Sequence, residues 1–226
     1  MKNDIYLNTI KKSVRNIQDT LPSRVLLVAA AKTRLPNEVK AAIDGGIKAI
    51  GYNYIQEAER MHETIENDVQ WHMIGHLQRN KVKKAVKLFD MIETIDSVKL
   101  AEAVNRQCVS EGKVMPVLIE INSGKESNKT GVLSENVDNL IRHISGLSNL
   151  RLRGIMTMGP RFGNPEDARP YFKATKALFE RIKKAKIPNV EMRYLSMGMS
   201  NSYKIAIAEG ANIVRIGTKL FGERKQ

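Results

Sequence analysis

The chain alternates between short apolar segments and longer amphipathic ones, and this alternation constrains its fold more than any other feature. Short runs rich in apolar or β-branched residues are typical of buried strands. They occur at Val25–Ala31, Ala49–Gly51, Trp71–Ile74, Met91–Ile95, Val114–Asn122, Arg153–Met158, Arg193–Ser196 and Ile213–Ile216. A stretch with helical periodicity follows each run, and an extra helix from about Ile5 to Thr20 precedes the first.

Strands that alternate with helices form a parallel sheet with right-handed connections. Eight such units close most simply as a (β/α)8 barrel of the TIM type, and this α/β architecture is the predicted fold. A doubly wound open sheet is the alternative that the same alternation permits. No linker, low-complexity tract or change in composition divides the chain, so we expect residues 1–226 to form a single domain.

Composition narrows the class of protein. Of 226 residues, 42% are hydrophobic, which is enough for a packed core and excludes a disordered or collagen-like chain. The N-terminus has no signal-peptide segment, and the longest apolar run, Val25–Ala31, is far shorter than the ~20 residues that cross a bilayer. Cys108 is the only cysteine, so neither an internal disulfide nor a cysteine zinc cage can form. We therefore expect a cytoplasmic protein without a membrane partner.

In a parallel barrel, functional residues lie at the carboxyl ends of the strands, and phosphate groups often bind after the seventh and eighth strands. Lys32 ends the first strand, and the apolar run before it would favour the neutral, nucleophilic amine that a Schiff base needs. Glycines and polar side chains follow the last two strands: Ser196, Gly198, Ser200, Asn201, Ser202, Gly217 and Thr218. Backbone N–H groups in such loops can hold an anion. An aldehyde-trapping lysine that faces a phosphate cradle is what a pyridoxal phosphate site requires.

These residues also have purely structural interpretations. Lys32 could be a solvent-facing lysine, and the glycine and serine loops could serve only as turns and helix caps. Arg215 lies inside the eighth strand, where it would point into the barrel mouth, donate to the pyridine nitrogen and keep that nitrogen unprotonated. The alternative for Arg215 is a structural ion pair with an acidic neighbour such as Glu209.

Several other kinds of site are not indicated. The sequence has no GxxxxGK(S/T) or GxGxxG motif, and His72 and His76 lack the HExxH pattern, so we expect neither a nucleotide loop of those types nor a metal site. The net charge is +13, and basic residues cluster in 79–87 and 181–186 on the outer faces of helices. A nucleic-acid-binding surface is the alternative, but aromatic residues are only 5% of the chain and do not interleave with these clusters. We expect no nucleic-acid partner.

Several stretches together resemble a known family. They are AAAKTRLPNEVKAAIDGGIKAIGYNYIQEA, WHMIGHLQRNKVK, MIETIDSVKLA, VLIEINSGKESNKTGV, LRGIMTM and LSMGMSNSYKIAIAEGANIVRIGTKLFGER. From about Val25 to Arg224, the chain resembles the pyridoxal phosphate homeostasis protein family (YggS/PROSC type). The resemblance implies a single barrel similar to the N-terminal domain of alanine racemase. It also implies a Schiff base with pyridoxal 5′-phosphate, no catalytic activity, and a role in intracellular vitamin B6 homeostasis.

The resemblance also implies roles for individual residues. Lys32 matches the lysine that forms the Schiff base, Arg215 matches the arginine that faces the pyridine nitrogen, and Asn53 matches an asparagine that lines the ring. The full set of implied cofactor-binding positions is Asn53, Ser196, Ser200, Arg215, Gly217 and Thr218. Ser200, Gly217 and Thr218 are the phosphate-binding positions among them.

Two residues depart from the pattern of that family. Tyr52 replaces a glutamate, which puts the polar contacts around Asn53 in doubt. Ser202 replaces an acidic residue, which bears on how the helix after the seventh strand is capped.

The comparison with alanine racemase separates a carrier from an enzyme. Racemisation needs a second acid or base across the cofactor from the lysine, and in the racemases a tyrosine of a separate β-domain supplies it. This chain reaches Gln226 soon after Thr218, so we do not expect that domain. Tyr52 or Tyr54 could replace the tyrosine only by reaching the cofactor face. A non-catalytic carrier is the preferred interpretation, and a racemase-like amino-acid enzyme and a nucleic-acid binder are the alternatives.

A carrier would exchange its cofactor with amines. Lys129, in the loop after the fifth strand, is a candidate second amine near the mouth, although it could equally be a solvent-facing loop lysine. Pyridoxal-phosphate-dependent apoenzymes are the expected recipients. A monomer is expected, because the dimer contact of the racemases involves their β-domain.

Overall fold

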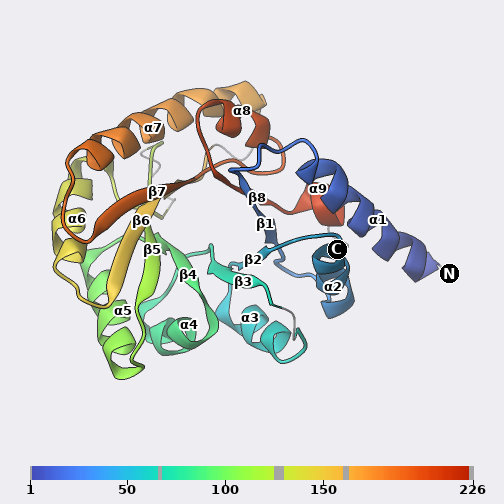
Figure 1. Ribbon diagram of the computed structural model, residues 1–226, viewed down its shortest axis with the longest axis horizontal. Helices are drawn as coiled ribbons and strands as arrows, with labels where there is room; N and C mark the ends of the chain where they lie inside the picture. Colours follow the sequence, from blue (N-terminus) through green and yellow to red (C-terminus); the bar gives the residue numbers. More distant parts are fainter. Residues whose placement is uncertain (1, 66–67, 125–129, 160–162, 224–226) are drawn as a thin grey trace.

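The computed structural model describes residues 2–65, 68–124, 130–159 and 163–223. The strands in these ranges are parallel and close into a barrel, in which each strand pairs with its neighbours in sequence and β8 pairs with β1 (Figure 1). They are β1 (Leu26–Ala30), β2 (Ala49–Tyr52), β3 (Gln70–Met73), β4 (Met91–Ile95), β5 (Met115–Ile121), β6 (Leu150–Thr157), β7 (Val190–Ser196) and β8 (Ile213–Ile216). The predicted (β/α)8 barrel is confirmed, and the open-sheet alternative is wrong.

Helices surround the barrel, and the predicted N-terminal helix is present. The helices are α1 (Lys2–Gln18), α2 (Pro36–Asp44), α3 (Ile55–His62), α4 (Val82–Leu88), α5 (Val98–Ser110), α6 (Val137–Ser145), α7 (Arg169–Lys184), α8 (Tyr203–Ala208) and α9 (Thr218–Phe221), with 3₁₀ turns at Arg79–Lys81, Ser134–Asn136 and Pro165–Ala168. Helix α1 packs beside α2 and α9, outside the ring (Figure 1). The Tyr6 hydroxyl lies 2.5 Å from Glu38 Oε1 and 2.7 Å from the Phe221 carbonyl oxygen, which ties α1 to both of those helices.

Two strands begin earlier than their apolar runs predict. Strand β6 starts at Leu150 and β7 at Val190, because their first residues include the half-exposed Arg151 and the exposed Glu191. An apolar run therefore begins later than the strand itself where the first residues of the strand are exposed at the amino-terminal end of the barrel.

The buried side chains form two layers. The larger layer lies between the strands and the helices, and includes the fully buried Phe89 and Phe172. The smaller layer fills the barrel interior with two apolar clusters. One consists of Val28, Ala49 and Ile213, and the other of Met91, Leu118 and Met156. The half-buried Tyr194 packs against both clusters. Side chains alternate along a strand, so residues two positions further toward the carboxyl ends also face inward, and several of these are polar.

Gly154 allows β6 and β7 to approach one another closely. Its φ angle is +156°, and a Cβ atom at this position would lie 1.8 Å from the carbonyl oxygen of Tyr194 on β7. The register of the β6–β7 pair also shifts between Leu152 and Gly154. Glycine is therefore required here by the backbone of the neighbouring strand.

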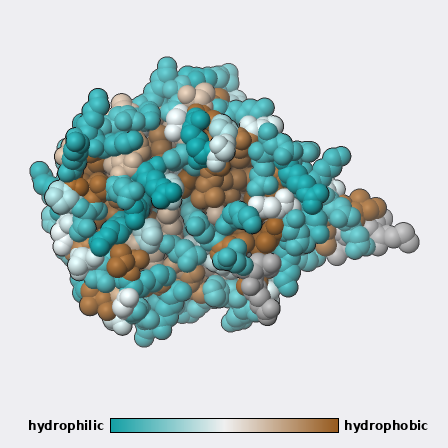
Figure 2. All heavy atoms as spheres, viewed as in Figure 1, coloured by the Kyte–Doolittle hydropathy of each residue, from teal (hydrophilic) through white to brown (hydrophobic). Residues whose placement is uncertain are grey.

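No helix among the described residues is long and apolar enough to cross a membrane. Hydrophilic side chains cover most of the face in Figure 2, and hydrophobic ones gather mainly toward its middle, where the strands of Figure 1 lie.

Candidate functional site at the barrel mouth

Lys32 lies in a tight turn at the carboxyl end of β1. The Arg34 N–H donates to the Ala31 carbonyl oxygen at 3.1 Å and closes this turn. The Lys32 side chain is half-buried, and its amine lies 3.4 Å from the hydroxyl of Tyr54 and 4.8 Å from the centre of that ring. The apolar strand thus lies below Lys32, while the amine reaches the mouth of the barrel.

Closure of the barrel places the last strand beside Lys32. Ala29 of β1 is in register with Ile216 of β8 in a parallel pair, so the segments that follow these two strands both lie at the carboxyl-terminal edge of the barrel. A Cβ atom on Gly217 would lie 3.2 Å from the Ala30 carbonyl oxygen, which shows how closely the two segments approach. The predicted lysine and the predicted eighth-strand loop therefore lie side by side.

The loops after β7 and β8 meet at Ser200. The backbone N–H groups of Gly217 and Lys219 both donate to Ser200 Oγ, at 3.3 and 3.4 Å. The Arg215 N–H donates to the Gly198 carbonyl oxygen at 3.0 Å and joins the two loops again. Two N–H groups and a hydroxyl thus converge on one point, next to the exposed Thr218.

Asn53 lies at the same edge, after β2, and its side chain is half-buried. A Cβ atom on Gly75 would come within 2.5 Å of the Asn53 backbone, so the loops after β2 and β3 are in close contact. The structure therefore brings six predicted site residues to one side of the mouth: Lys32, Asn53, Ser200, Arg215, Gly217 and Thr218.

Ser196 lies deeper than predicted. Its side chain is fully buried inside the barrel, where its hydroxyl donates to Glu93 Oε2 at 2.6 Å and accepts from Arg215 at 2.5 Å. Ser196 thus contacts Arg215 from below rather than lining the open loop.

Arg215 is the centre of a buried polar network beneath the mouth. Its guanidinium also donates to the Thr157 carbonyl oxygen at 2.9 Å and lies 3.8 Å from Glu93 Oε2. The other carboxylate oxygen of Glu93 lies 2.7 Å from His72 Nδ1. Glu93 is 0% exposed, His72 1% and Arg215 3%, so the network is closed to solvent. The Arg215 side chain therefore points into the barrel interior, just below the mouth.

The ion-pair partner proposed for Arg215 from the sequence was wrong. Glu209 pairs with Arg169 at 2.5 Å, whereas the acidic partner of Arg215 is Glu93, from the opposite half of the sequence. Burial would raise the pKa of Glu93, but the hydrogen bond to His72 and the charges of His72 and Arg215 hold it below its ordinary value. Burial lowers the pKa of Arg215, and the negative charge of Glu93 opposes that effect.

A second buried carboxyl group lies near this network. Glu120, at the end of β5, is 4% exposed; Thr130 Oγ1 donates to its Oε1 at 2.9 Å, and within the described residues its Oε2 has no hydrogen-bond partner. Burial raises the pKa of Glu120; the hydrogen bond from Thr130 opposes this shift, and the nearby Asp96 adds to it. Glu120 therefore favours the protonated form more than an exposed glutamate does.

Glu120→Gln should gain stability over the wild type as pH rises. The raised pKa means that the folded chain binds this proton more tightly than the unfolded chain. The stability that protonated Glu120 contributes is fully present below the ordinary glutamate pKa of about 4.3, and it is lost as pH rises through the pKa of Glu120 in the folded chain. Glutamine mimics the protonated acid at every pH. Chemical unfolding at pH 4 and pH 7 should show the difference between variant and wild type growing with pH.

The control for this prediction is Glu180→Gln. A hydrogen bond from Lys176 lowers the pKa of Glu180, so this variant should lose stability relative to the wild type as pH rises. A pH-independent difference for Glu120→Gln would contradict the prediction.

Of the two residues that depart from the family pattern, Tyr52 lies away from the phosphate-side loops, whereas Ser202 lies in the loop after β7, two residues beyond Ser200. Tyr52 is 1% exposed and stacks on Trp71, with ring centres 5.7 Å apart, in the layer between strands and helices. The Ser202 hydroxyl accepts from the Met199 N–H at 3.3 Å and makes no capping bond to α8. Lys129 lies outside the described residues.

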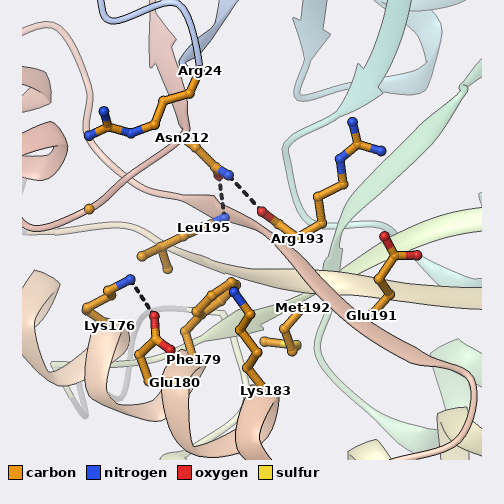
Figure 3. A pocket seen from close by; sticks show the side chains of 11 residues that line it. Arg24, Lys176, Phe179, Glu180, Lys183, Glu191, Met192, Arg193, Leu195 and Asn212 are labelled. Atoms are coloured by element: carbon orange, nitrogen blue, oxygen red, sulfur yellow. Dashed lines mark hydrogen bonds and ion pairs between the residues drawn. The ribbon is translucent and has the colours of Figure 1, made fainter. Parts of the chain in front are cut away.

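No group of three His, Cys, Asp or Glu side chains among the described residues could hold a metal ion. A groove of about 560 Å³ lies away from the mouth, between α7 and the starts of β7 and β8 (Figure 3). Its floor includes Phe179, Met192 and Leu195, and none of the predicted site residues lines it. The groove is therefore separate from the candidate site.

The relatives of the chain are consistent with this geometry. A family model described as alanine racemase, N-terminal domain, matches residues 5–225. The pyridoxal phosphate homeostasis protein of Aquifex aeolicus is 40% identical over 200 residues, which cover 88% of this chain and 87% of that protein. The one from Haemophilus influenzae is 34% identical over 224 residues, covering 96% and 94%. The chain belongs to the pyridoxal phosphate homeostasis protein family.

Solved structures agree with this membership. PipY from Synechococcus elongatus PCC7942, solved without PLP, has a TM-score of 0.89 and 29% identity, covering 94% of this chain and all of that one. PipY with PLP bound has a TM-score of 0.87. Alanine racemase of Clostridium difficile 630 has a TM-score of 0.77 at 17% identity, and the match covers 57% of its length, so it shows the fold alone.

The sequence interpretation of this family member missed the support beneath Arg215. No role was predicted for Glu93, Thr157 or Glu120, and His72 was expected to be a packed or site-lining histidine rather than a metal ligand. A polar residue at an alternate position inside an otherwise apolar strand, as in MIETI, is the signal that could have found Glu93. That signal identifies an inward-facing group but not its partner.

Proposed function

We propose that this protein holds pyridoxal 5′-phosphate as a Schiff base on Lys32, without catalytic turnover, and serves intracellular vitamin B6 homeostasis. The pairing of β1 with β8 carries the proposal, because it sets a lysine at the mouth beside the loops of Ser200 and Gly217. The relatives are named pyridoxal phosphate homeostasis proteins, and PipY has been solved with PLP bound, which supports the same ligand here.

The residues at the mouth fit three polar groups of this cofactor: its aldehyde, its phosphate and its pyridine nitrogen. When bound, pyridoxal phosphate supplies an aldehyde that condenses reversibly with a primary amine, and Lys32 offers that amine. The N–H groups that converge on Ser200 suit phosphate oxygens, which accept hydrogen bonds. The Arg215 guanidinium has donors only, so it suits the lone pair of the pyridine nitrogen. We propose that Asn53 lines the ring and that Thr218 adds a hydroxyl to the phosphate side.

Arg215 also favours a holding role over turnover. A guanidinium cannot give up its proton at physiological pH, so it leaves the ring nitrogen unprotonated and the ring a weak sink for electrons. Glu93 and Ser196 keep the guanidinium in place and charged.

The placement of the tyrosines supports the same conclusion. A racemase needs an acid or base across the cofactor from the lysine. Tyr52 is buried against Trp71 on the helix side of the strands, and Tyr54 lies beside the Lys32 amine itself. Neither is placed opposite Lys32, so we propose a carrier. We infer further that it acts in the cytoplasm as a monomeric single domain, with apoenzymes as recipients.

Borohydride trapping tests the proposed function. Purified protein incubated with pyridoxal phosphate and then reduced should carry one cofactor adduct, and peptide mass spectrometry should place it on Lys32. Lys32→Ala should lose that adduct and the visible absorption band.

Lys84→Ala is the matched control, because Lys84 pairs with Glu59 on the outer helices and should leave the adduct unchanged. An adduct on other lysines at the wild-type yield would contradict the role of Lys32. Sustained racemisation or transamination that disappears in Lys32→Ala would contradict the non-catalytic role.

A further inference from the structure

The residue after Lys32 has an unusual backbone conformation. Thr33 has a φ angle of +62°, in the left-handed region that β-branched residues rarely adopt. Among the other described non-glycine residues, only Lys186 and Asn189 have positive φ angles, and both lie between α7 and β7. Such strain persists only where the surrounding structure enforces it. Here it lies one peptide bond from the proposed cofactor lysine.

The conformation belongs to the turn that presents Lys32. The turn runs from Ala31 to Arg34, with Lys32 and Thr33 as its central residues. A turn with a positive φ at its third position normally has glycine there. Thr33 therefore needs an external contact to hold it in this conformation.

Glu57 provides such a contact. The Thr33 N–H donates to Glu57 Oε2 at 3.1 Å, and the Thr33 hydroxyl donates to the Lys32 carbonyl oxygen at 2.7 Å. Glu57 lies in the first turn of α3, directly after the segment that carries Asn53 and Tyr54. A hydrogen bond to a charged acceptor is stronger than a neutral one. Glu57 thus connects the lysine turn to the neighbouring loop.

We propose that Glu57 is a positioning residue for Lys32. By accepting the Thr33 N–H, it holds the turn in its left-handed conformation and so directs the Lys32 amine to the mouth beside Tyr54. Loss of the Glu57 carboxylate lets the Thr33 peptide relax toward an unstrained conformation, and the amine then leaves its place beside Tyr54. The inference rests on the proposed function, since it concerns how Lys32 meets the cofactor.

The proposal predicts the effects of removing and of replacing this contact. Glu57→Ala should weaken pyridoxal phosphate binding by about tenfold, as expected for losing a hydrogen bond to a charged group. Glu57→Gln keeps an acceptor oxygen and should stay within about threefold of the wild type. Absorbance titration and the yield of the borohydride-trapped Lys32 adduct measure both effects.

Thr33→Gly provides a rescue that a general loss of structure would not show. Glycine adopts a positive φ without strain, so the turn no longer needs Glu57. The double variant Glu57→Ala/Thr33→Gly should bind within about threefold of Thr33→Gly alone. Glu59→Ala is the matched control, because it removes a carboxylate from the same helix that pairs with Lys84, and its binding should equal that of the wild type. Thermal melting confirms that each variant is folded.

The possible outcomes separate this inference from the proposed function. A wild-type protein that forms no Lys32 adduct contradicts the proposed function. A wild-type adduct with unchanged binding in Glu57→Ala overturns the positioning role alone. Weakened binding that Thr33→Gly does not restore also overturns it, because Glu57 would then act other than through the turn.

Discussion

Glu93→Ala should lower the free energy of unfolding by about 3–5 kcal/mol, as breaking a buried ion pair does. The change leaves Arg215, which is 3% exposed, without a balancing charge inside the barrel. It also removes the acceptor of the Ser196 hydroxyl and the partner of His72. For a chain of this size, the loss corresponds to a fall in melting temperature of roughly 6 °C or more. Chemical unfolding with calorimetry measures it.

A double variant shows whether the charge left behind causes this loss. Glu93→Met/Arg215→Met removes both charges, so it should cost less than the sum of the two single variants. Additive losses would contradict the interpretation. Glu93→Gln keeps the shape and the acceptor oxygen, and should fall between the wild type and Glu93→Ala.

The same carboxylate gives the prediction a pH dependence. The pKa of Glu93 is lowered in the folded chain, so its contribution to stability is present above the ordinary glutamate value of about 4.3 and is lost as pH falls through the folded pKa. The stability gap between the wild type and Glu93→Ala should therefore narrow on acidification. A gap that widens below pH 4 would contradict the assignment.

Gly154→Ala should also destabilise the fold strongly, by about 3 kcal/mol, the upper end of the usual overpacking range. The new methyl group would meet the Tyr194 carbonyl oxygen, which belongs to the backbone of the paired strand and cannot rotate away. The φ angle of +156° adds strain for any residue with a Cβ atom. Relief requires β6 and β7 to separate, which would disturb Thr157 and Ser196 at their upper ends.

Gly146→Ala is the matched control. A Cβ atom at Gly146 would meet only the His143 carbonyl oxygen, at the ordinary contact distance of 3.6 Å, and the φ angle of Gly146 is −85°. This variant should melt within a few degrees of the wild type. Equal melting temperatures for the two alanine variants would show that β6 and β7 tolerate the methyl group.

The sequence predicted the features that depend on local pattern. Apolar runs alternating with amphipathic stretches predicted the barrel, and the rule that functional groups follow parallel strands predicts Lys32 and Gly217 as site candidates from the sequence alone. Both positions depend only on where strands end, and β1 and β8 end within a residue of their predicted limits.

The features that the sequence did not predict depend on contacts between distant segments. The alternative for Arg215 was an ion pair with an acidic neighbour such as Glu209, but closure of the barrel brings it to Glu93 instead. The alternation of side chains along a strand shows which residues face the barrel interior, but not which residue of another strand each of them contacts there. The strain at Thr33 was missed for a related reason, because the Glu57 that accepts its N–H comes from α3, beyond both α2 and β2.

The pairing of the first strand with the last has a consequence for biosynthesis. During translation, the segment with Lys32 leaves the ribosome long before the residues around Gly217 exist. A nascent chain therefore carries the Lys32 amine without the adjoining loop after β8, and long-range pairing of this kind forms slowly. Binding of the cofactor should accordingly require the completed barrel. A ligand that contacts the chain after both β1 and β8 should stabilise the closed barrel against unfolding.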